Sequence, residues 1–565
     1  MRRSTSPLLL ELDLTQPLIE IEPEDPVAKL RSRGRPRLKS VLRTLYDAGA
    51  DPRVAGLVAK VGNPAMPLAQ AQEIRDAVRA FASSGKPTFA WAETYGENTP
   101  ASVTYFLASG FGEVWLQPSG EVNLLGVAME TRFLRGLLDK LGVVPELGQR
   151  YEYKNAADRI LRTEMSDAHR EAYDRLAASA WEQIVAGIAE TRGLTAEAVQ
   201  EIADRAPVSA ADAVTAGLVD HVGYRDEVYA AARRAAGNSG DVTLLFADKW
   251  SKPEQPVAKV VRQVRARKSP AIALVEGHGG VVIGRSRRSP TQGPMMGSDT
   301  VSAQLRAATR DDNVKAIVFR VDSPGGSYVA SDTIWREVNC AREAGKPVVV
   351  SMGAVAGSGG YFVACPADVI VAQPGTLTGS IGVLGGKAVV AGLTDKIGLS
   401  YDSVQRGEHA RMYSTHEAFS DSERERLDAF LDAVYVDFTT KVAQGRGMTR
   451  DEVHEVARGR VWTGADAREN GLVDELGGLR DAVRIARQRA GLSDDAPVRP
   501  AVSVPPIARL KPPKSSDDPR AAATMSVAMS GWGDLAGVAA ALGFSSLGPL
   551  VMGPLVMDGV RAIRS

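Results

Sequence analysis

Hydrophobic residues along the chain gather in short β-branched runs, and these runs alternate with longer stretches of helical spacing. Ala316–Val321 and Val348–Met352 are two such runs, each with the length and composition of a buried strand. Between them, Ser331–Ala344 carries apolar residues at helical spacing, and Gly345 is a typical helix stop. Strands that alternate with helices are joined by crossover connections. The pattern therefore predicts an α/β fold.

This alternation occurs twice, because short signatures in the first half of the chain return in the second half. The offset between partners drifts only between 254 and 260 residues. The signatures, each with its later partner, are Gly85–Pro87 and Gly345–Pro347, Tyr105-Phe106 and Tyr361-Phe362, Gln117-Pro118 and Gln373-Pro374, Gln149-Arg150 and Gln405-Arg406, and Gly217–Asp220 and Gly471–Asp474. Ordered matches with small drifts predict two homologous domains in tandem rather than a many-unit solenoid.

Composition divides the chain into four parts. Residues 1–250 form the expected N-terminal domain and residues 271–490 the C-terminal domain, while residues 251–270 are rich in proline and basic residues and are expected to be a linker. Residues 491–565 comprise a Pro-rich segment and an apolar tail. In that tail, residues 535–557 carry no charge over a bilayer-spanning length, but they contain several glycines and two prolines. A membrane span, an interfacial segment and a segment buried in an assembly all stay open.

The N-terminal segment lacks the pattern of a signal peptide or a membrane anchor. The apolar run Leu8–Leu10 is shorter than a signal-peptide core, and Glu11 and Asp13 follow it at once. We therefore expect the protein to be membrane-associated or cytoplasmic. The basic run Lys259–Lys268 is expected to be a solvated face, with peripheral contact to anionic lipid heads as the functional alternative.

Charge and cysteine content exclude several classes of protein. The chain of 565 residues has 68 basic and 68 acidic residues, and this balance argues against a protein that binds nucleic acid over its whole surface. Cys340 and Cys365 are the two cysteines, too few for a disulfide framework or a four-cysteine zinc site. His416 and His454 lack the second histidine of a zinc-protease motif, and the sequence has no Walker loop or dinucleotide fingerprint. We expect no metal and no cofactor.

A candidate nucleophile follows the predicted strand Val348–Met352. Ser358 has glycines on both sides, which let the backbone bend sharply and let a substrate approach closely. A serine at a helix N-terminus also faces free N–H groups that favour an oxyanion. Ser323–Gly326 can present a backbone N–H group to a carbonyl oxygen, and Thr376–Gly382 offers hydroxyl groups. The structural alternatives are a serine N-cap and an ordinary Pro-Gly turn.

Taken in order, Ser-Pro-Gly-Gly at 323–326, Gly-Ser-Gly-Gly-Tyr at 357–361 and Leu-Thr-Gly-Ser-Ile-Gly at 377–382 resemble the signal peptide peptidase A family, also called protease IV, in its long two-domain form. Tyr153-Lys154-Asn155-Ala156 fits the lysine motif of that family, and the resemblance covers roughly residues 8–490. It implies tandem Clp protease/crotonase-like domains in a bowl-shaped homo-oligomer, expected to be a tetramer. It also implies hydrophobic peptide substrates such as cleaved signal peptides.

The resemblance assigns a role to each residue of these motifs. Ser358 is implied to be the nucleophile of a Ser–Lys dyad and Lys154 its general base. Gly359 and either Gly325 or Gly326 are implied to form the oxyanion hole, and Ser380 to orient Lys154.

The duplication supports the assignment independently, because each half keeps one part of the dyad. Position 102, the partner of Ser358, is a serine without flanking glycines, and Ser380 corresponds to Leu124. Conversely, Lys154 corresponds to Ala410 in the second half. Ala65-Met66 replaces the Gly-Gly pair in the first half. A purely structural duplication has no reason to degenerate in this complementary way.

Lysine chemistry sets one condition on this mechanism. The ordinary lysine pKa is about 10.4, so a base that works near neutrality needs its pKa lowered by about 2–3 units through desolvation. Three alternatives stay open: a Ser–His–Asp peptidase, a crotonase-like acyl-CoA hydratase or isomerase, and a catalytically idle scaffold associated with the membrane.

Overall fold

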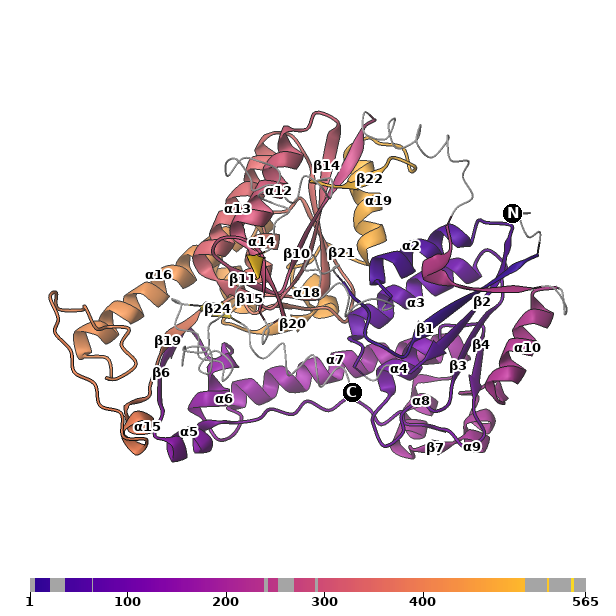
Figure 1. Ribbon diagram of the computed structural model, residues 1–565, viewed down its shortest axis with the longest axis horizontal. Helices are drawn as coiled ribbons and strands as arrows, with labels where there is room; N and C mark the ends of the chain where they lie inside the picture. The colour runs from indigo at the N-terminus through magenta and orange to yellow at the C-terminus, as the bar shows by residue number, and fades with distance from the viewer. Residues whose placement is uncertain are drawn as a thin grey trace. The chain divides into compact units, whose positions relative to one another are not determined.

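The chain divides into two compact units. The first comprises Met1–Met129, Ala177–Gln263 and Val560–Ser565, and the second comprises Glu130–Leu176 and Val264–Gly559. Residues 130–176 therefore fold with the second unit, although the repeat assigns them to the N-terminal half of the chain. The computed structural model describes residues 6–20, 36–62, 65–237, 242–251, 269–289, 293–502, 526–527 and 550–552 (Figure 1). Most of the predicted linker and most of the apolar tail lie outside these ranges.

The first unit is built on a six-stranded parallel sheet with the strand order β8-β4-β3-β2-β1-β9. Its strands are β1 (Leu8–Leu14), β2 (Val54–Val61), β3 (Thr88–Ala92), β4 (Glu113–Leu116), β8 (His221–Val222) and β9 (Thr243–Phe246). Two short strands, β5 (Glu121–Val122) and β7 (Val208–Ser209), form a separate antiparallel pair.

Helices join these strands, as the alternating pattern predicts. They are α2 (Leu38–Ala48), α3 (Leu68–Ala82), α4 (Ser102–Ala108), α8 (Ala196–Asp204), α9 (Ala210–Thr215), α10 (Arg225–Ala235) and the short 3-10 helix η2 (Ala247–Lys249). Helix α7 (Asp167–Arg192) begins in the second unit and ends in the first. Val228 and Tyr229 of α10 belong to one buried cluster with Leu9, Val58 and Phe89 of the sheet. The central strands β2 and β3 are almost wholly buried, as expected for parallel strands with helices on both faces.

The second unit has a larger sheet of the same kind. Its strand order is β20-β18-β16-β14-β10-β22, with β17 paired to β16 and β21 to β17. The strands are β10 (Ala271–His278), β14 (Val314–Ser323), β16 (Val348–Gly357), β17 (Val369–Ala372), β18 (Leu377–Gly379), β20 (Val461–Thr463), β21 (Glu475–Leu476) and β22 (Val498–Pro500). All pairs are parallel except β18 with β20. The two predicted strands are confirmed, Ala316–Val321 as the centre of β14 and Val348–Met352 as the first half of β16.

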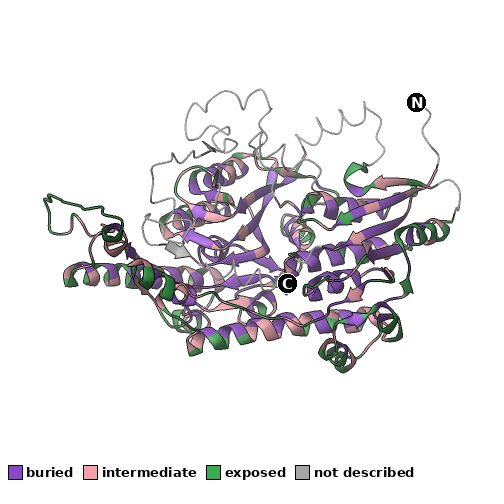
Figure 2. Ribbon diagram, turned by 60° about the horizontal axis from the view of Figure 1, so that its bottom comes forward, coloured by how far each residue is buried: buried purple, intermediate pink, exposed green. Residues whose placement is uncertain are grey.

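Helices bury both faces of the central strands β10, β14 and β16, and the central strands in Figure 2 are coloured as buried. The helices of the second unit are α5 (Arg135–Leu141), η1 (Asn155–Ala157), α6 (Asp158–Leu161), α12 (Ser298–Arg310), α13 (Tyr328–Glu343), α14 (Gly359–Ala364), α15 (Ala391–Lys396), α16 (Asp421–Arg446), α17 (Arg450–Val456), α18 (Gly464–Glu469) and α19 (Leu479–Arg489). One cluster joins Ile334 of α13 and Phe438 of α16 to Phe319 of β14, and a second joins Ile485 of α19 to Val349 of β16. Thus the predicted α/β class is confirmed.

Helix α13 begins three residues before its predicted start. The Ser327 side chain caps the helix, because its Oγ accepts a hydrogen bond from the Ala330 N–H group at 3.4 Å. Gly345 follows the helix in the left-handed conformation, with φ of 76°, so the predicted stop is confirmed.

Two smaller sheets complete the second unit. Strand β6 (Val144–Gln149) pairs antiparallel with β19 (Leu384–Val389), and Figure 1 shows this indigo-violet strand lying beside an orange one. A mixed sheet has the order β23-β12-β13-β11-β15-β24. Its strands are β11 (Gly280–Val282), β12 (Arg287–Ser289), β13 (Gly293–Gly297), β15 (Gly325–Ser327), β23 (Ser526–Val527) and β24 (Leu550–Met552).

The predicted duplication is visible as the same contacts made twice. In the first unit the Tyr105 hydroxyl donates to the Leu218 carbonyl oxygen at 2.6 Å, and in the second the Tyr361 hydroxyl donates to the Leu472 carbonyl oxygen at 2.9 Å. Arginine–aspartate ion pairs recur in the same way, as Arg192 with Asp220 and Arg446 with Asp474. Among the helices in the described ranges, none has the length and apolar character needed to cross a membrane.

Candidate active site

Ser358 lies at a sharp turn between β16 and α14, inside the second unit. Its φ and ψ are 54° and −116°, a conformation that costs energy for any residue with a side chain. The surrounding backbone holds it there, because the Ser358 N–H group donates to the Gly379 carbonyl oxygen at 2.8 Å. The Ser358 carbonyl oxygen accepts the first hydrogen bond of the next helix, from Phe362 at 2.8 Å. The turn therefore fixes the direction of a side chain that is fully buried.

Lys154 reaches this serine from a segment that is 204 residues earlier in the sequence. Its Nζ atom lies 2.9 Å from Ser358 Oγ, 2.8 Å from the Ser380 carbonyl oxygen and 3.0 Å from Ser380 Oγ. Only 1% of the lysine is exposed, and desolvation lowers its pKa from 10.5 to about 7. A neutral amine has two N–H donors and one lone pair. When the carbonyl and hydroxyl oxygens of Ser380 accept hydrogen bonds from the two N–H groups, the lone pair faces the Ser358 hydroxyl.

The Gly-Gly segment at the end of β14 lies against the nucleophile turn. A methyl group added at Gly359 would lie 3.0 Å from the Gly326 nitrogen and 3.2 Å from the Gly325 Cα atom, so these backbones are in contact. The Gly325 N–H group donates to Ser323 Oγ at 3.1 Å. The Ser323 hydroxyl in turn donates to the Gly279 carbonyl oxygen at 2.7 Å. Thus Gly325 already has a partner for its N–H group.

The first-half counterparts of these residues form no similar pair. Ser102 is buried in the first unit, and its hydroxyl donates to the Gly126 carbonyl oxygen at 2.7 Å. Leu124 is a buried apolar residue. In the second unit, Ala410, the counterpart of Lys154, is exposed.

Several histidines are engaged away from the serine. His169 Nδ1 lies 3.3 Å from Asp158 Oδ2, and His454 Nδ1 lies 2.9 Å from the Tyr435 hydroxyl. The His416 ring stacks on Tyr401 with their centroids 3.5 Å apart. These contacts weigh against a Ser–His–Asp arrangement at Ser358.

Sequence reasoning missed the residues that surround the lysine. The Tyr153 hydroxyl donates to Glu171 Oε2 at 2.7 Å, and Arg460 forms an ion pair with Glu171 at 2.7 Å. Gly459 and Gly382 pack directly against Lys154. The only local signal is a glycine between two arginines, at Arg458-Gly459-Arg460, and such a pattern is common in exposed loops.

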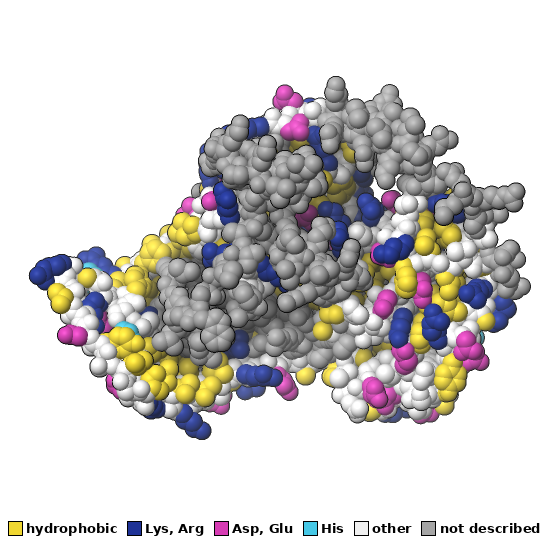
Figure 3. Space-filling view, viewed as in Figure 1, with side chains coloured by type: hydrophobic (Ala, Val, Ile, Leu, Met, Phe, Trp, Pro, Cys, Tyr) yellow, Lys and Arg dark blue, Asp and Glu magenta, His cyan; other side chains and the backbone are white. Residues whose placement is uncertain are grey.

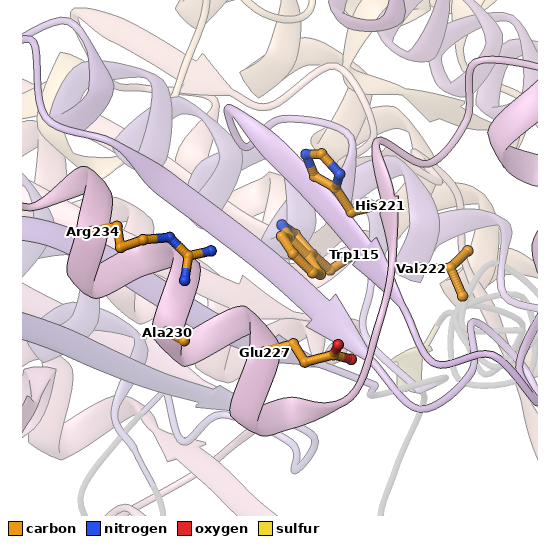
Figure 4. A pocket seen from close by; sticks show the side chains of 6 residues that line it. All are labelled: Trp115, His221, Val222, Glu227, Ala230 and Arg234. Atoms are coloured by element: carbon orange, nitrogen blue, oxygen red, sulfur yellow. The ribbon is translucent and has the colours of Figure 1, made fainter. Parts of the chain in front are cut away.

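A separate cavity of about 310 Å³ lies in the first unit (Figure 4). Its lining residues are Trp115, His221, Val222, Glu227, Ala230 and Arg234. Glu227 is occupied as a helix cap, because its carboxylate accepts the Tyr224 N–H group at 2.8 Å. His221 packs on Trp115 with centroids 4.6 Å apart. These side chains have structural roles, so the Ser358 region is the stronger candidate.

Known proteins resemble this chain in both of its halves. The sequence profile of peptidase family S49 matches residues 80–239 and 340–493, one stretch in each half of the chain. Protease 4 of Salmonella typhi is 36% identical over 471 residues, which cover 80% of this chain and 72% of that protein. The chloroplastic serine protease SPPA of Arabidopsis thaliana is 32% identical over 483 residues, with coverage of 83% and 69%. A solved ClpP1 mutant from Listeria monocytogenes aligns at 14% identity with a TM-score of 0.24, covering 40% of this chain and 99% of that one.

Proposed function

The chain belongs to peptidase family S49, and we propose that it is a serine endopeptidase in which Ser358 is the nucleophile and Lys154 the general base. The observation that carries the proposal is the 2.9 Å contact between Lys154 Nζ and Ser358 Oγ, with both groups buried. A serine hydroxyl needs a base to become a useful nucleophile, and a lysine with a pKa of about 7 is half neutral at that pH.

The reaction follows the steps of covalent catalysis. Lys154 takes the hydroxyl proton as Ser358 Oγ attacks the peptide carbonyl carbon, which gives a tetrahedral oxyanion. The protonated lysine then gives that proton to the leaving amine, and an acyl-enzyme remains. Water attacks the acyl group with Lys154 as base, and Ser358 is released. Ser380 holds the amine in line throughout, through its carbonyl oxygen and its hydroxyl.

For the oxyanion hole we propose the N–H groups of Gly359 and Gly326. Gly359 is the first residue of α14, where N–H groups are free of helical partners. Gly326 is favoured over Gly325 because the Gly325 N–H group already donates to Ser323 Oγ. Both candidate donors lie on backbone without side chains, so a carbonyl oxygen can approach them.

The substrate we propose is an extended peptide with apolar residues, of the kind found in cleaved signal peptides. Strand β15 carries Gly325 and Gly326 and lies between β11 and β24, so a peptide that replaces β24 would pair with β15 as an added strand, which is a common mode of peptide binding. Such pairing occurs within this chain, since β24 lies antiparallel to β15 with Gly326 opposite Val551. A peptide in that place would run past the nucleophile turn.

Labelling by a fluorophosphonate probe tests the dyad without knowledge of the natural substrate. The wild-type protein should be labelled at Ser358, and Ser358→Ala and Lys154→Ala should not be labelled. Ser102→Ala is the matched control, because it removes a buried hydroxyl of the first unit, and its labelling should equal that of the wild type. Wild-type labelling of Lys154→Ala would mean that another residue is the base. A hydratase or an idle scaffold would not react at all.

We also propose that the chain forms a homo-oligomer, with a tetramer expected. Large apolar residues are exposed on α5, on β6 and in the segment that follows α15: Leu137, Val144, Ile397, Leu399, Tyr401 and Val404. Yellow side chains gather at the lower left of Figure 3, where these elements lie. Exposed apolar patches of this kind mark contact surfaces. Light scattering should show one oligomer, and a monodisperse active monomer would contradict the proposal.

A further inference from the structure

Lys154 is covered by a tight turn, Ala457–Arg460, that lies about 300 residues later in the sequence. The turn connects α17 to β20, and two consecutive residues in it are left-handed, with φ of 50° at Arg458 and 87° at Gly459. The backbone of the turn is held from several sides. The Arg458 N–H group donates to the Tyr435 hydroxyl at 3.3 Å, and the Arg460 N–H group donates to the Ala457 carbonyl oxygen at 2.9 Å.

Gly459 lies flat against the backbone of the lysine. A methyl group added there would lie 2.4 Å from Lys154 N and 2.5 Å from both Lys154 Cα and Cβ, distances that real side chains do not adopt. Gly382 contacts both Gly459 and the lysine side chain, since a methyl group there would lie 2.9 Å from Gly459 Cα and 3.2 Å from Lys154 Cδ. The lysine is therefore packed against two neighbouring glycines, Gly459 at its backbone and Gly382 at its side chain, and neither position has room for a methyl group without a shift.

The same turn also holds the partner of the lysine amine. The Gly459 N–H group donates to the Ile381 carbonyl oxygen at 2.8 Å, and the Ser380 N–H group donates to the Arg460 carbonyl oxygen at 2.7 Å. Ser380 supplies the two oxygens that bind Lys154 Nζ. One turn thus fixes both the backbone of the base and the group that orients it.

Ion pairs fasten the turn on both sides of the lysine. Arg458 binds Glu152 at 3.1 Å, and Arg460 binds Glu171 at 2.7 Å. Both guanidinium groups lie over the Tyr153 ring, at 5.4 and 4.9 Å from its centroid. Glu152 and Tyr153 directly precede Lys154, so the contacts hold the turn at the lysine itself.

We propose that Gly459 is a positioning residue, which keeps Lys154 pressed beneath the Ala457–Arg460 turn and excludes water from its amine. The inference rests on the proposed Ser358–Lys154 dyad and adds the element that makes the lysine a base. Burial is the cause of the lowered pKa of Lys154, so the packing above it sets that pKa. The titratable groups on the surrounding elements have partners of their own: Glu152, Tyr153, Asp158, Glu171, Tyr435, His454, Arg458 and Arg460.

The test is the rate of fluorophosphonate labelling of Ser358 between pH 5 and 10 in three glycine variants of the full chain. Gly459→Ala should admit water to the amine and raise the midpoint of the acidic limb by about one pH unit, so labelling at pH 7 should fall about fivefold and recover near pH 9.5. Gly382→Ala should shift the midpoint in the same direction by less. Gly447→Ala is the matched control, because Gly447 is also left-handed, with φ of 65°, and an added methyl meets nothing within 4 Å. Its midpoint should equal that of the wild type.

An unshifted midpoint in Gly459→Ala, or an equal shift in Gly447→Ala, would overturn the inference. So would a loss of rate that is the same at every pH, because a merely structural defect does not recover at high pH. If Gly459→Ala fails to fold by circular dichroism, Gly382→Ala decides, and an unshifted midpoint there refutes the inference. Lys154→Ala is measured beside them. Wild-type labelling of that variant refutes the dyad itself, whereas an inactive Lys154→Ala with unshifted glycine variants refutes the role of Gly459 alone.

Discussion

Replacing Lys154 by methionine should stabilise the second unit, and the gain should shrink as the pH rises. Methionine has a similar length and no charge. In the folded protein the pKa of Lys154 falls from 10.5 to about 7 through desolvation, whereas the unfolded chain keeps the ordinary value. The unfolded state therefore binds more protons between these two values, and the wild-type protein loses stability as the pH falls through this window. The loss of stability is complete below about pH 7. The Lys154→Met variant has no amine to protonate, so its stability does not fall in this way.

The size of the effect follows from the shift. A difference of about 3.5 pH units corresponds to about 5 kcal/mol, because each unit is worth about 1.36 kcal/mol. About 4 kcal/mol of this penalty is present at pH 7 and about 2 kcal/mol at pH 9. The variant also loses the hydrogen bonds to Ser358 and Ser380, which costs about 1–3 kcal/mol at either pH. The hydrogen-bond loss is the same at both pH values, so it cancels when the stabilisation at pH 9 is subtracted from that at pH 7. The remaining difference is about 2 kcal/mol.

Urea unfolding followed by circular dichroism, at pH 7 and pH 9, measures this difference. Lys315→Met is the matched control, because Lys315 is exposed on β14 and the same chemical change there removes no buried amine. The control should change the free energy of unfolding equally at both pH values. If Lys154→Met also changes it equally at both, the lysine is not held neutral by burial, and the argument for its role as a base at neutral pH fails.

Three further predictions concern the two halves of the chain. Residues 265–565 expressed alone should not be labelled by a fluorophosphonate, because this fragment lacks Lys154. Addition of residues 1–250, which carry Lys154, should restore labelling. Labelling of the single fragment would contradict the split dyad. Mixed full-length Lys154→Ala and Ser358→Ala chains should stay inactive on an apolar fluorogenic peptide, because both groups lie in the second unit of one chain; recovery would indicate a dyad shared between protomers. Arg446→Met should lower the free energy of unfolding by about 1–3 kcal/mol, because it leaves the half-buried Asp474 carboxylate without its ion pair. An unchanged urea midpoint would contradict this.

Much of the fold was predictable because its signals are local. The β-branched runs of β14 and β16 and the helical spacing of α13 can be recognised within a few residues of sequence. The duplication was predictable for another reason, since the repeated signatures include residues with the same contact in both units. Tyr105 and Tyr361, for example, each donate to a leucine carbonyl oxygen.

The position of residues 130–176 could not be predicted in this way. The repeat places them in the first half, yet β6 pairs with β19, more than 200 residues later in the sequence. No periodicity encodes which distant strand an edge strand will choose. Lys154 was predicted as the base from the resemblance carried by Tyr153-Lys154-Asn155-Ala156, and the alanine at the corresponding position 410 supported that prediction. The contact between Gly459 and Lys154 could not be predicted from the sequence, because it depends on the absence of a side chain at position 459.

The order of these residues along the chain has a consequence for biosynthesis. Lys154 is made first, Ser358 follows 204 residues later, and Gly459 follows after 459 − 154 = 305 residues. At about 5–20 residues per second, a ribosome needs roughly 15–60 s to pass from the lysine to the turn that covers it. During that interval the packing that buries Lys154 in the folded protein is incomplete. The proposed Ser358–Lys154 dyad therefore lacks the cover over its lysine until most of the second unit has been synthesised.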